Sequence, residues 1–276
     1  MRACAWFLPL LIALPACAGV PGIGAATCAS DVPFPDLAAA LRTWEAVDLT
    51  HPLDASVPYW PGSKYFPFEA WDLAKWEEVR AFSRAYRVPE HYGTHVDAPI
   101  HFAEGQAAME AVPVTAFYGP AVVFDIRAKA AADPDAALTA EDVAAWEREH
   151  GRVPEGAIAL LRTGWEERWG SVEAYRNFDE NGELRFPSYG IDAARVLLVE
   201  RGCKGLCVDG LSVDRGVDPG FPVHRLGSGM GRWFAENLAN LGRLPPAGAV
   251  VFVLPVPLRG GSGAQARAVA FLPPAR

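Results

Sequence analysis

The sequence predicts a single α/β domain built around a mixed β-sheet. Two apolar runs, at 119–127 and 156–165, are typical of strands buried on both faces. A segment with clear helix start and stop signals lies between them. No repeat or flexible linker divides the chain, so strands and helices are expected to alternate within one unit.

The first half of the chain supplies the clearest elements. An opening strand is predicted over 46–53, followed by a proline-rich stretch. The helix between the buried strands is predicted to begin after Thr139 as N-cap, with Asp142 three residues on, and to end at Gly151. The polar and aromatic stretch at 165–190 is interpreted as an excursion over the surface of the core.

The second half continues the alternation. A helix is predicted over 191–202, with Asp192 near its start and Gly202 after its end. Further strands are predicted in KGLCVDG, in GAVVFVLPV and in ARAVAFL, the last after a tight turn in RGGSGAQ.

The N-terminus is predicted to be an export signal. Arg2 precedes fourteen uncharged residues, a length too short to span a bilayer but typical of a signal peptide, and cleavage is expected after Ala18 or Ala26. LPAC, which ends at Cys17, resembles a lipoprotein box, so the alternative is a signal that ends before a lipidated Cys17. The predicted division is a signal peptide (1–26), an N-terminal extension (27–45) and one domain (46–276). The expected location is the periplasm or the outside of the cell, with membrane attachment only through a lipid.

Charge and cysteine content limit the classes of partner. The net charge is −8 and Lys and Arg form no run, so nucleic acid is not expected as a partner.

After the signal the cysteines are Cys28, Cys203 and Cys207, which allows at most one internal disulfide. Cys203 and Cys207 are too far apart on a predicted strand to pair with each other. A pair of Cys28 with either one stays open, and Cys207 is expected to be buried.

Three of the six histidines lie in HYGTHVDAPIHF, beside an aspartate. An extended conformation would place the side chains of His95 and Asp97 on one face, because strand side chains alternate. Gly93 permits a sharp bend that could bring His91 to the same point. Two imidazoles and one carboxylate that converge make a site for a divalent metal.

A second set of candidate ligands, His224 and Glu236, lies twelve residues apart near the C-terminus. We expect His224 before a loop and Glu236 on a following amphipathic helix. Alone this pair indicates little, but beside the first cluster it supplies the nitrogen and the carboxylate that a second metal would need.

These motifs resemble the cyclase family of metal-dependent hydrolases, which includes kynurenine formamidase (arylformamidase) and isatin hydrolase. HYGTHVDAPIHF is similar to the family signature, and DLTHPLDASVPYWPG to its opening strand and Pro-x-Trp-Pro-Gly turn. VDGLSVD is similar to the strand before the second half-site, and GGSGAQARAVAFL to the C-terminal end. The likeness runs from about residue 46 to residue 272. It implies the family's swivelling β/β/α fold, and usually a homodimer with each site near the interface.

The resemblance also implies a ligand set. His91, His95 and Asp97 would hold one metal ion. Asp97 would bridge to a second ion, completed by His224 and Glu236. Zinc is the expected metal, with up to two ions per chain, and manganese is the alternative.

Outside the ligand set, the resemblance implies that His101 is the acid/base and that Trp60 lines the substrate pocket. Metal-bound water drops in pKa from 15.7 to roughly 7, and an imidazole can carry its proton to a leaving nitrogen. The expected reaction is the attack of metal-activated water on the amide carbonyl of a small molecule, as in an arylformamidase. The alternatives are the opening of a cyclic amide such as isatin and, from another class, an exported metal-binding module without catalysis.

Four further residues have weaker signals. His150 ends a predicted helix, where a partial positive charge suits the dipole, and a structural role is expected. His51 at a strand end is expected to be structural too, with a place in the pocket as the alternative. Asp209 and Asp214 either orient metal-bound histidines or occupy turns. Compared with the compact formamidases, the chain is longer chiefly through 128–150 and 165–190.

Overall fold

The computed structural model describes residues 41–274, which belong to one compact unit. The predicted signal peptide, Cys17, Cys28 and most of the predicted extension lie outside the described residues. Among residues 41–274, no helix combines the length and the apolar composition needed to cross a bilayer.

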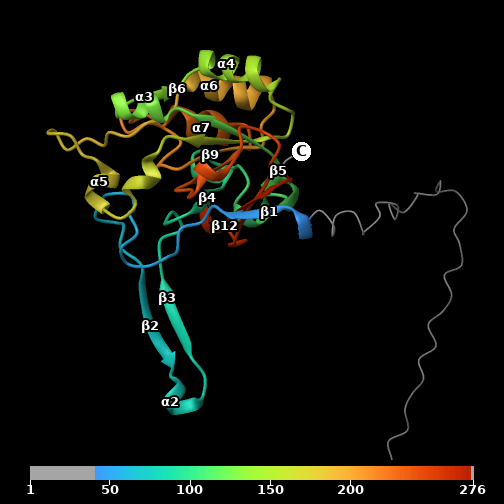
Figure 1. Cartoon of the computed structure of the whole chain (residues 1–276). Helices are drawn as coiled ribbons and strands as arrows, with labels where there is room; N and C mark the ends of the chain where they lie inside the picture. The colour runs from blue at the N-terminus through green and yellow to red at the C-terminus, as the bar shows by residue number, and fades with distance from the viewer. Residues whose placement is uncertain (1–40, 275–276) are drawn as a thin grey trace, which may run out of the picture. The chain divides into compact units, whose positions relative to one another are not determined.

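The main sheet closes on itself to form a barrel (Figure 1). Its strands are β1 (Glu45–Asp48), β4 (His95–Asp97), β5 (Tyr118–Asp125), β7 (Ile158–Arg162), β9 (Gly205–Val208), β10 (Trp233–Glu236), β11 (Val250–Pro255) and β12 (Gly263–Leu272). They follow the order β1-β12-β11-β5-β7-β9-β10-β4, and β4 pairs again with β12. Strands β5, β7, β9 and β10 run parallel, whereas β4, β11 and β12 make antiparallel pairs. The prediction of a mixed α/β domain is confirmed.

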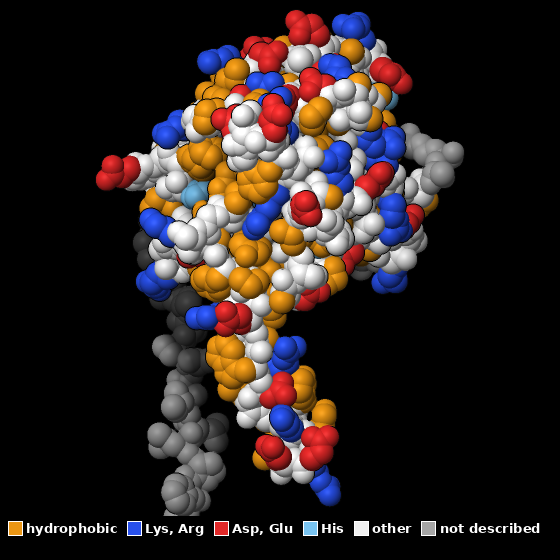
Figure 2. Space-filling view, turned by 90° about the vertical axis from the view of Figure 1, so that its left-hand side faces the viewer, with side chains coloured by type: hydrophobic (Ala, Val, Ile, Leu, Met, Phe, Trp, Pro, Cys, Tyr) orange, Lys and Arg blue, Asp and Glu red, His pale blue; other side chains and the backbone are white. Residues whose placement is uncertain are grey.

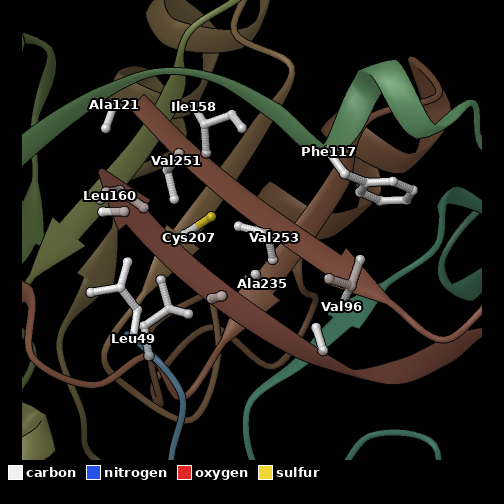
Figure 3. Packing of buried hydrophobic residues seen from close by; sticks show 14 of the residues in the cluster. Leu49, Val96, Phe117, Ala121, Ile158, Leu160, Cys207, Ala235, Val251 and Val253 are labelled. Carbon is white, nitrogen blue, oxygen red and sulfur yellow. The ribbon is translucent and has the colours of Figure 1, made fainter. Parts of the chain in front are cut away.

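The buried strands face two cores because their side chains alternate. Ala121, Leu160 and Val251 point into the barrel, where the inner core collects (Figure 3). Val122 and Phe124, on the opposite face of β5, pack in a second core with residues of the covering helices. Burial on both faces explains why these strands appear in the sequence as continuous apolar runs.

Helices cover the outer face of the parallel strands (Figure 1). They are α3 (Arg127–Ala132), α4 (Ala140–His150), α6 (Ile191–Arg195), which continues as a π-helix (Val196–Glu200), and α7 (Pro222–Gly229). The predicted start of α4 is confirmed: the Thr139 side chain accepts from the Asp142 amide, and the Asp142 side chain accepts from the Thr139 amide. The helix ends at Gly151, whose φ of +88° suits glycine.

The interpretation of 165–190 as a surface excursion is wrong in part. The stretch forms α5 (Val172–Arg176) and β8 (Ser188–Tyr189), which pairs with β6 (Ala137–Leu138). Trp165, Tyr175 and Phe186 are buried and form a third apolar cluster with Leu211. Polar residues between these aromatics hide the cluster in the sequence. Short 3-10 helices complete the fold, at Pro99–His101, Met109–Ala111, Val114–Phe117, Trp165–Arg168 and Leu241–Arg243.

A hairpin at residues 69–87, called the arm below, is not anticipated by the sequence analysis. It consists of β2 (Glu69–Ala74), α2 (Trp76–Val79) and β3 (Ser83–Arg87), and it projects from the barrel (Figure 1). Apolar side chains lie along its length (Figure 2). Those that are 49–63% exposed are Trp71, Leu73, Trp76, Val79, Phe82 and Tyr86. A two-stranded ribbon of this kind is marginally stable by itself in water.

Both described cysteines are buried. Cys207 lies in the inner core, as predicted, and Cys203 in the second core. Within residues 41–274 neither forms a disulfide.

Candidate active site

The predicted ligands meet where β4 closes the barrel. His95 and Asp97 lie on β4, between β10 and β12, and both are buried. Gly93 has a φ of +65°, which confirms the predicted bend before the strand. Glu236 ends β10 directly opposite His95. The extended conformation predicted for 95–97 is confirmed.

The predicted placement of the second ligand pair is wrong. His224 lies on helix α7, which starts with a proline at its first position, and Glu236 lies on strand β10. All four residues of β10 are buried, so their apolar run has no strand periodicity that would separate it from a helix. The two side chains nevertheless reach the first cluster.

Asp97 presents one carboxylate oxygen to each set of imidazoles. Its Oδ1 lies 2.6 Å from His91 Nδ1 and 3.2 Å from His95 Nε2. Its Oδ2 lies 3.0 Å from His224 Nε2. Glu236 spans the same two sides, with Oε2 at 3.5 Å from His95 Nε2 and Oε1 at 3.3 Å from His224 Nε2. The five side chains therefore form one cluster with Asp97 at its centre.

Two of the imidazole rings, those of His95 and His224, are held in place by a hydrogen bond at the ring nitrogen that faces away from Asp97. His95 Nδ1 lies 2.9 Å from the carbonyl oxygen of Gly93, which can only accept, so Nδ1 carries the proton. His95 Nε2 is then a buried nitrogen with no hydrogen-bond partner among the described residues. His224 Nδ1 lies 2.6 Å from Asp214, which confirms that Asp214 is placed to orient a candidate ligand.

Asp209 does not share the position of Asp214. Its carboxylate accepts from the backbone and hydroxyl of Thr163 and from the amide of Gly164. Burial raises the pKa of Asp209 to about 6, against the effect of these hydrogen bonds. Its side chain orients the chain after β7 rather than a histidine.

Ser262 holds His91, a contact that the sequence analysis missed. Ser262 Oγ lies 2.9 Å from His91 Nε2 and donates to Glu90 at 2.8 Å. A Cβ at Gly263 would lie 2.5 Å from His91 Cε1, so only glycine permits this approach. Ser262 is 171 residues from His91, and only the pairing of β4 with β12 brings them together.

The electrostatics of the cluster fit a bound cation. Burial lowers the pKa of His95, but Asp97, Glu236 and the Gly93 carbonyl outweigh it and raise the pKa to about 9. Burial likewise opposes the shift at His224, whose pKa is held well above its usual value by Asp214, Asp97 and Glu236. In the metal-free protein, protons on the imidazoles supply positive charge between the nitrogens and the carboxylates, and a bound cation would take their place. A set of imidazole and carboxylate donors with one orphaned nitrogen fits a divalent metal.

His101 lies against the cluster. Its ring stacks on His91 at 3.9 Å between centroids, and its nearest nitrogen lies within 4.8 Å of the ligand atoms of His91 and Asp97. Burial lowers the pKa of His101 to about 4, so the imidazole is uncharged at neutral pH. The geometry brings His101 within reach of a proton at this site, and its exclusion from the ligand set stays a prediction.

A cavity of about 270 Å³ opens over the cluster. Its aromatic walls are Tyr59, Trp60, Tyr65, Phe102 and Phe221. Trp60 therefore lies where it was predicted, with its ring 5.9 Å from Phe221 and 6.5 Å from Phe186. The cavity is thus lined both by aromatic rings and by the ionisable cluster.

The other two histidines lie outside this cavity. His51 stacks on Trp169 at 3.8 Å, and burial lowers its pKa to about 4. His150 ends α4 and packs against Trp146 at 4.9 Å. Both contacts are structural, as predicted.

Asp214→Asn is expected to weaken divalent-metal binding by about 10–100-fold, because His224 loses the carboxylate that fixes its ring. Titration of the purified protein with Zn²⁺ against a chromophoric chelator measures the loss. Asp218→Asn removes a carboxylate that, among the described residues, forms its ion pair with Arg215, and it serves as the matched control. Equal affinities in the two variants would show that Asp214 does not position His224.

Comparisons with known proteins agree with this geometry. The family model described as "Putative cyclase" matches residues 47–215. Isatin hydrolase of Roseibium aggregatum is 36% identical over 194 residues, which cover 67% of this chain and 73% of the relative. Kynurenine formamidase of Bacillus cereus is 26% identical over 230 residues, which cover 83% of this chain and 98% of the relative.

Solved structures show the same fold. Isatin hydrolase A from Ralstonia solanacearum matches with a TM-score of 0.83 and 32% identity, over 90% of this chain and 100% of that one. A predicted metal-dependent hydrolase from Bacillus stearothermophilus matches with a TM-score of 0.62 and 25% identity, over 83% of this chain and 98% of that one. The closed mixed barrel and its buried histidine–carboxylate cluster define a metal-dependent hydrolase. The chain belongs to the cyclase family.

Proposed function

We propose that the protein hydrolyses the C–N bond of a small aromatic amide, most like an arylformamidase acting on N-formylkynurenine. One observation carries the proposal: Asp97 presents one oxygen to each of two imidazole sets in the lining of an aromatic-walled cavity. A cavity of about 270 Å³ suits a small molecule, and its rings suit an aryl group.

We infer that the cluster holds two divalent ions, most simply zinc, with manganese as the alternative. His91 and His95 face one oxygen of Asp97, and His224 faces the other, with Glu236 between them. A divalent ion in this position makes water a stronger acid and an amide carbonyl a better electrophile.

The protein's own groups supply the proton transfer and the dry surroundings. Uncharged His101 is proposed to take a proton from the attacking water and return it to the nitrogen that leaves. Water adds to the carbonyl carbon, the C–N bond breaks, and the products are a carboxylic acid and an arylamine. The centroid of the Phe102 ring lies 4.4 Å from the ring centroids of both His101 and His224. In this position Phe102 keeps bulk water from the reacting atoms.

Opening of a cyclic aryl amide such as isatin is the second candidate. The 36% identity to isatin hydrolase, against 26% to kynurenine formamidase, favours it. The same water attack would cleave the ring C–N bond and leave both product groups on one molecule.

A substrate screen on metal-analysed protein tests both candidates. We expect hydrolysis of N-formylkynurenine and formanilide, with loss of activity on chelation and recovery on reloading with Zn²⁺ or Mn²⁺. Hydrolysis of isatin alone would select the second candidate. Full metal loading without turnover of any aryl amide would overturn both and favour an exported metal-binding module.

We also propose that the chain forms a homodimer through the arm. Six large apolar side chains of a marginal two-stranded ribbon are exposed, which a second copy would bury. Trp71→Glu and Trp76→Glu should each weaken the dimer by roughly 30-fold, as expected for central interface tryptophans. Sedimentation measures the change, and Val114→Glu, at an equally exposed position of the body, is the control. A monomeric native protein, or an equal effect of Val114→Glu, would contradict the proposal.

The protein is further proposed to be exported, free or as a lipoprotein. The uncharged stretch after Arg2 supports this. Mass spectrometry of protein from the native host should find a chain that begins after Ala18 or Ala26, or at an acylated Cys17. An intact N-terminus on soluble cytoplasmic protein would refute export.

A further inference from the structure

A chain of hydrogen bonds connects the aromatic cluster of segment 165–190 to the candidate metal ligand His95. The hydroxyl of Tyr175 on α5 lies 2.9 Å from Asn237 Oδ1 and 2.9 Å from the carbonyl oxygen of Asp209. Asn237 Nδ2 donates to the carbonyl oxygen of Gly93 at 2.9 Å. The same carbonyl oxygen accepts from His95 Nδ1.

The direction of these bonds is fixed at both ends. The carbonyl oxygen of Gly93 can only accept, so Asn237 must face it with its NH₂ group and turn Oδ1 towards Tyr175. The hydroxyl of Tyr175 faces two acceptors, so it acts as the donor and its single proton is shared between Asn237 Oδ1 and the carbonyl oxygen of Asp209. The chain thereby fixes the His95 ring: its Nδ1–H donates to the Gly93 carbonyl, and Nε2 is directed towards Asp97.

The backbone supports the same arrangement. Asn237 directly follows Glu236, has a φ of +58°, and lines the cavity. Its backbone carbonyl accepts from the Thr94 hydroxyl at 2.6 Å, next to His95 in the chain. A shift of Asn237 would therefore move the surroundings of two ligands at once.

We propose that Tyr175 is a positioning residue for the metal centre: through Asn237 it fixes the Gly93 carbonyl, and this carbonyl orients His95. The inference rests on the proposed metal centre but not on any particular substrate. Segment 165–190 is then part of the machinery that shapes the ligand set. Tyr175 does not line the cavity, and among the described residues its hydroxyl bonds to no ligand side chain, which explains why sequence motifs around the ligands do not reveal it.

Packing alone does not require the hydroxyl of Tyr175. Its ring fills the aromatic cluster with Trp165 and Phe186, and a phenylalanine would fill the same space. Tyr189 offers a matched comparison, because it is equally buried and its hydroxyl bonds to two backbone carbonyls of the barrel strands, Ala159 and Cys207. It has no described contact with the ligand set.

Zn²⁺ titration of Tyr175→Phe against a chromophoric chelator tests the proposal, with Tyr189→Phe as the control. We expect Tyr175→Phe to lower the Zn²⁺ affinity about fivefold, the usual effect of one lost hydrogen bond, and Tyr189→Phe to leave it unchanged within twofold. Thermal unfolding of the metal-free proteins gives the loss of stability separately. Equal Zn²⁺ affinities in the two variants would overturn the proposal. Native protein that binds neither Zn²⁺ nor Mn²⁺ would instead refute the proposed function.

Asn237→Asp keeps the test decisive should Tyr175→Phe fail to fold. The new carboxylate still accepts from Tyr175 but faces the Gly93 carbonyl without a donor, and aspartate tolerates a positive φ. We expect a loss of Zn²⁺ affinity of about 10–100-fold. Tyr175→Phe should have no further effect on affinity in this background, because both changes act through one chain. Additive losses would show that Tyr175 acts by another route.

Discussion

Asp97→Asn is expected to remove most of the bound metal and to lower kcat/KM by about 10³-fold or more. Asp97 is 2% exposed, and its two oxygens face imidazoles on both sides of the cluster. Burial opposes its charge, but His91, His224 and His95 hold its pKa well below the usual value. Asparagine has no charge and only one acceptor oxygen, so both sides of the site lose a ligand. A bound metal ion lowers the activation free energy by several kcal/mol, so its loss corresponds to the expected decrease in kcat/KM.

Comparison of variants separates bridging from ordinary ligation. Asp97→Asn should lose more metal than His224→Ala or Glu236→Gln, because Asp97 approaches the two imidazole sets to 2.6 and 3.0 Å, whereas Glu236 lies at 3.5 and 3.3 Å. Asp209→Asn is the control for replacing a fully buried aspartate, and it should cost stability without releasing metal. Elemental analysis beside activity gives both quantities. Full occupancy in Asp97→Asn would defeat the bridging assignment.

His101→Ala is expected to lower kcat by about 10²–10⁴-fold while the fold and most of the metal remain, the usual contribution of a positioned proton-transfer group. The uncharged imidazole is the form that accepts a proton, so the base is lost as the pH falls through its pKa, about 4 in the metal-free protein. The acidic limb of the pH–rate profile should change in the variant.

The decisive measurement is kcat and metal content in one His101→Ala preparation. The ligand atoms of His91, Asp97 and His101 lie within 4.8 Å of one another, so ligation by His101 is the competing assignment. Activity that falls only in step with metal loss would select ligation. Activity within a few-fold of native at full loading would exclude proton transfer. His150→Ala, which removes an imidazole packed on Trp146 outside the cavity, should leave kcat unchanged.

Local sequence rules predicted the parts of the site that depend on neighbours in the chain. The alternation of a strand places His95 and Asp97 on one face, and a glycine turns His91 towards them. The capping box at Thr139 is equally local, and it marks α4 correctly. The later pair, His224 and Glu236, was a weak candidate by itself, and the resemblance to the cyclase family assigned it to a second ion and added Trp60; all three residues lie at the cavity.

The parts of the site that were not predicted depend on pairing between strands that lie far apart in the sequence. Ser262 reaches His91 only because β12 pairs with β4, and no periodicity near either residue indicates that pairing. Glu236 was expected on a helix because a strand buried on both faces has no alternation. The arm alternates polar and apolar residues weakly, since neither of its faces is buried by the described chain.

The strand that closes the barrel also sets when the metal centre can be completed. His91, His95 and Asp97 lie in the first half of the chain, whereas Ser262 and Gly263, which lock His91 in place, lie near its end. During synthesis these three side chains therefore emerge long before the strand that encloses them. Until that strand pairs, they can bind metal ions only as a flexible chelator, whose preference among ions follows their intrinsic affinities for nitrogen and oxygen ligands. Geometry can select among ions only after the last strand has paired. If the chain is exported unfolded, the ion that it carries is the one available where the barrel closes, outside the cytoplasm.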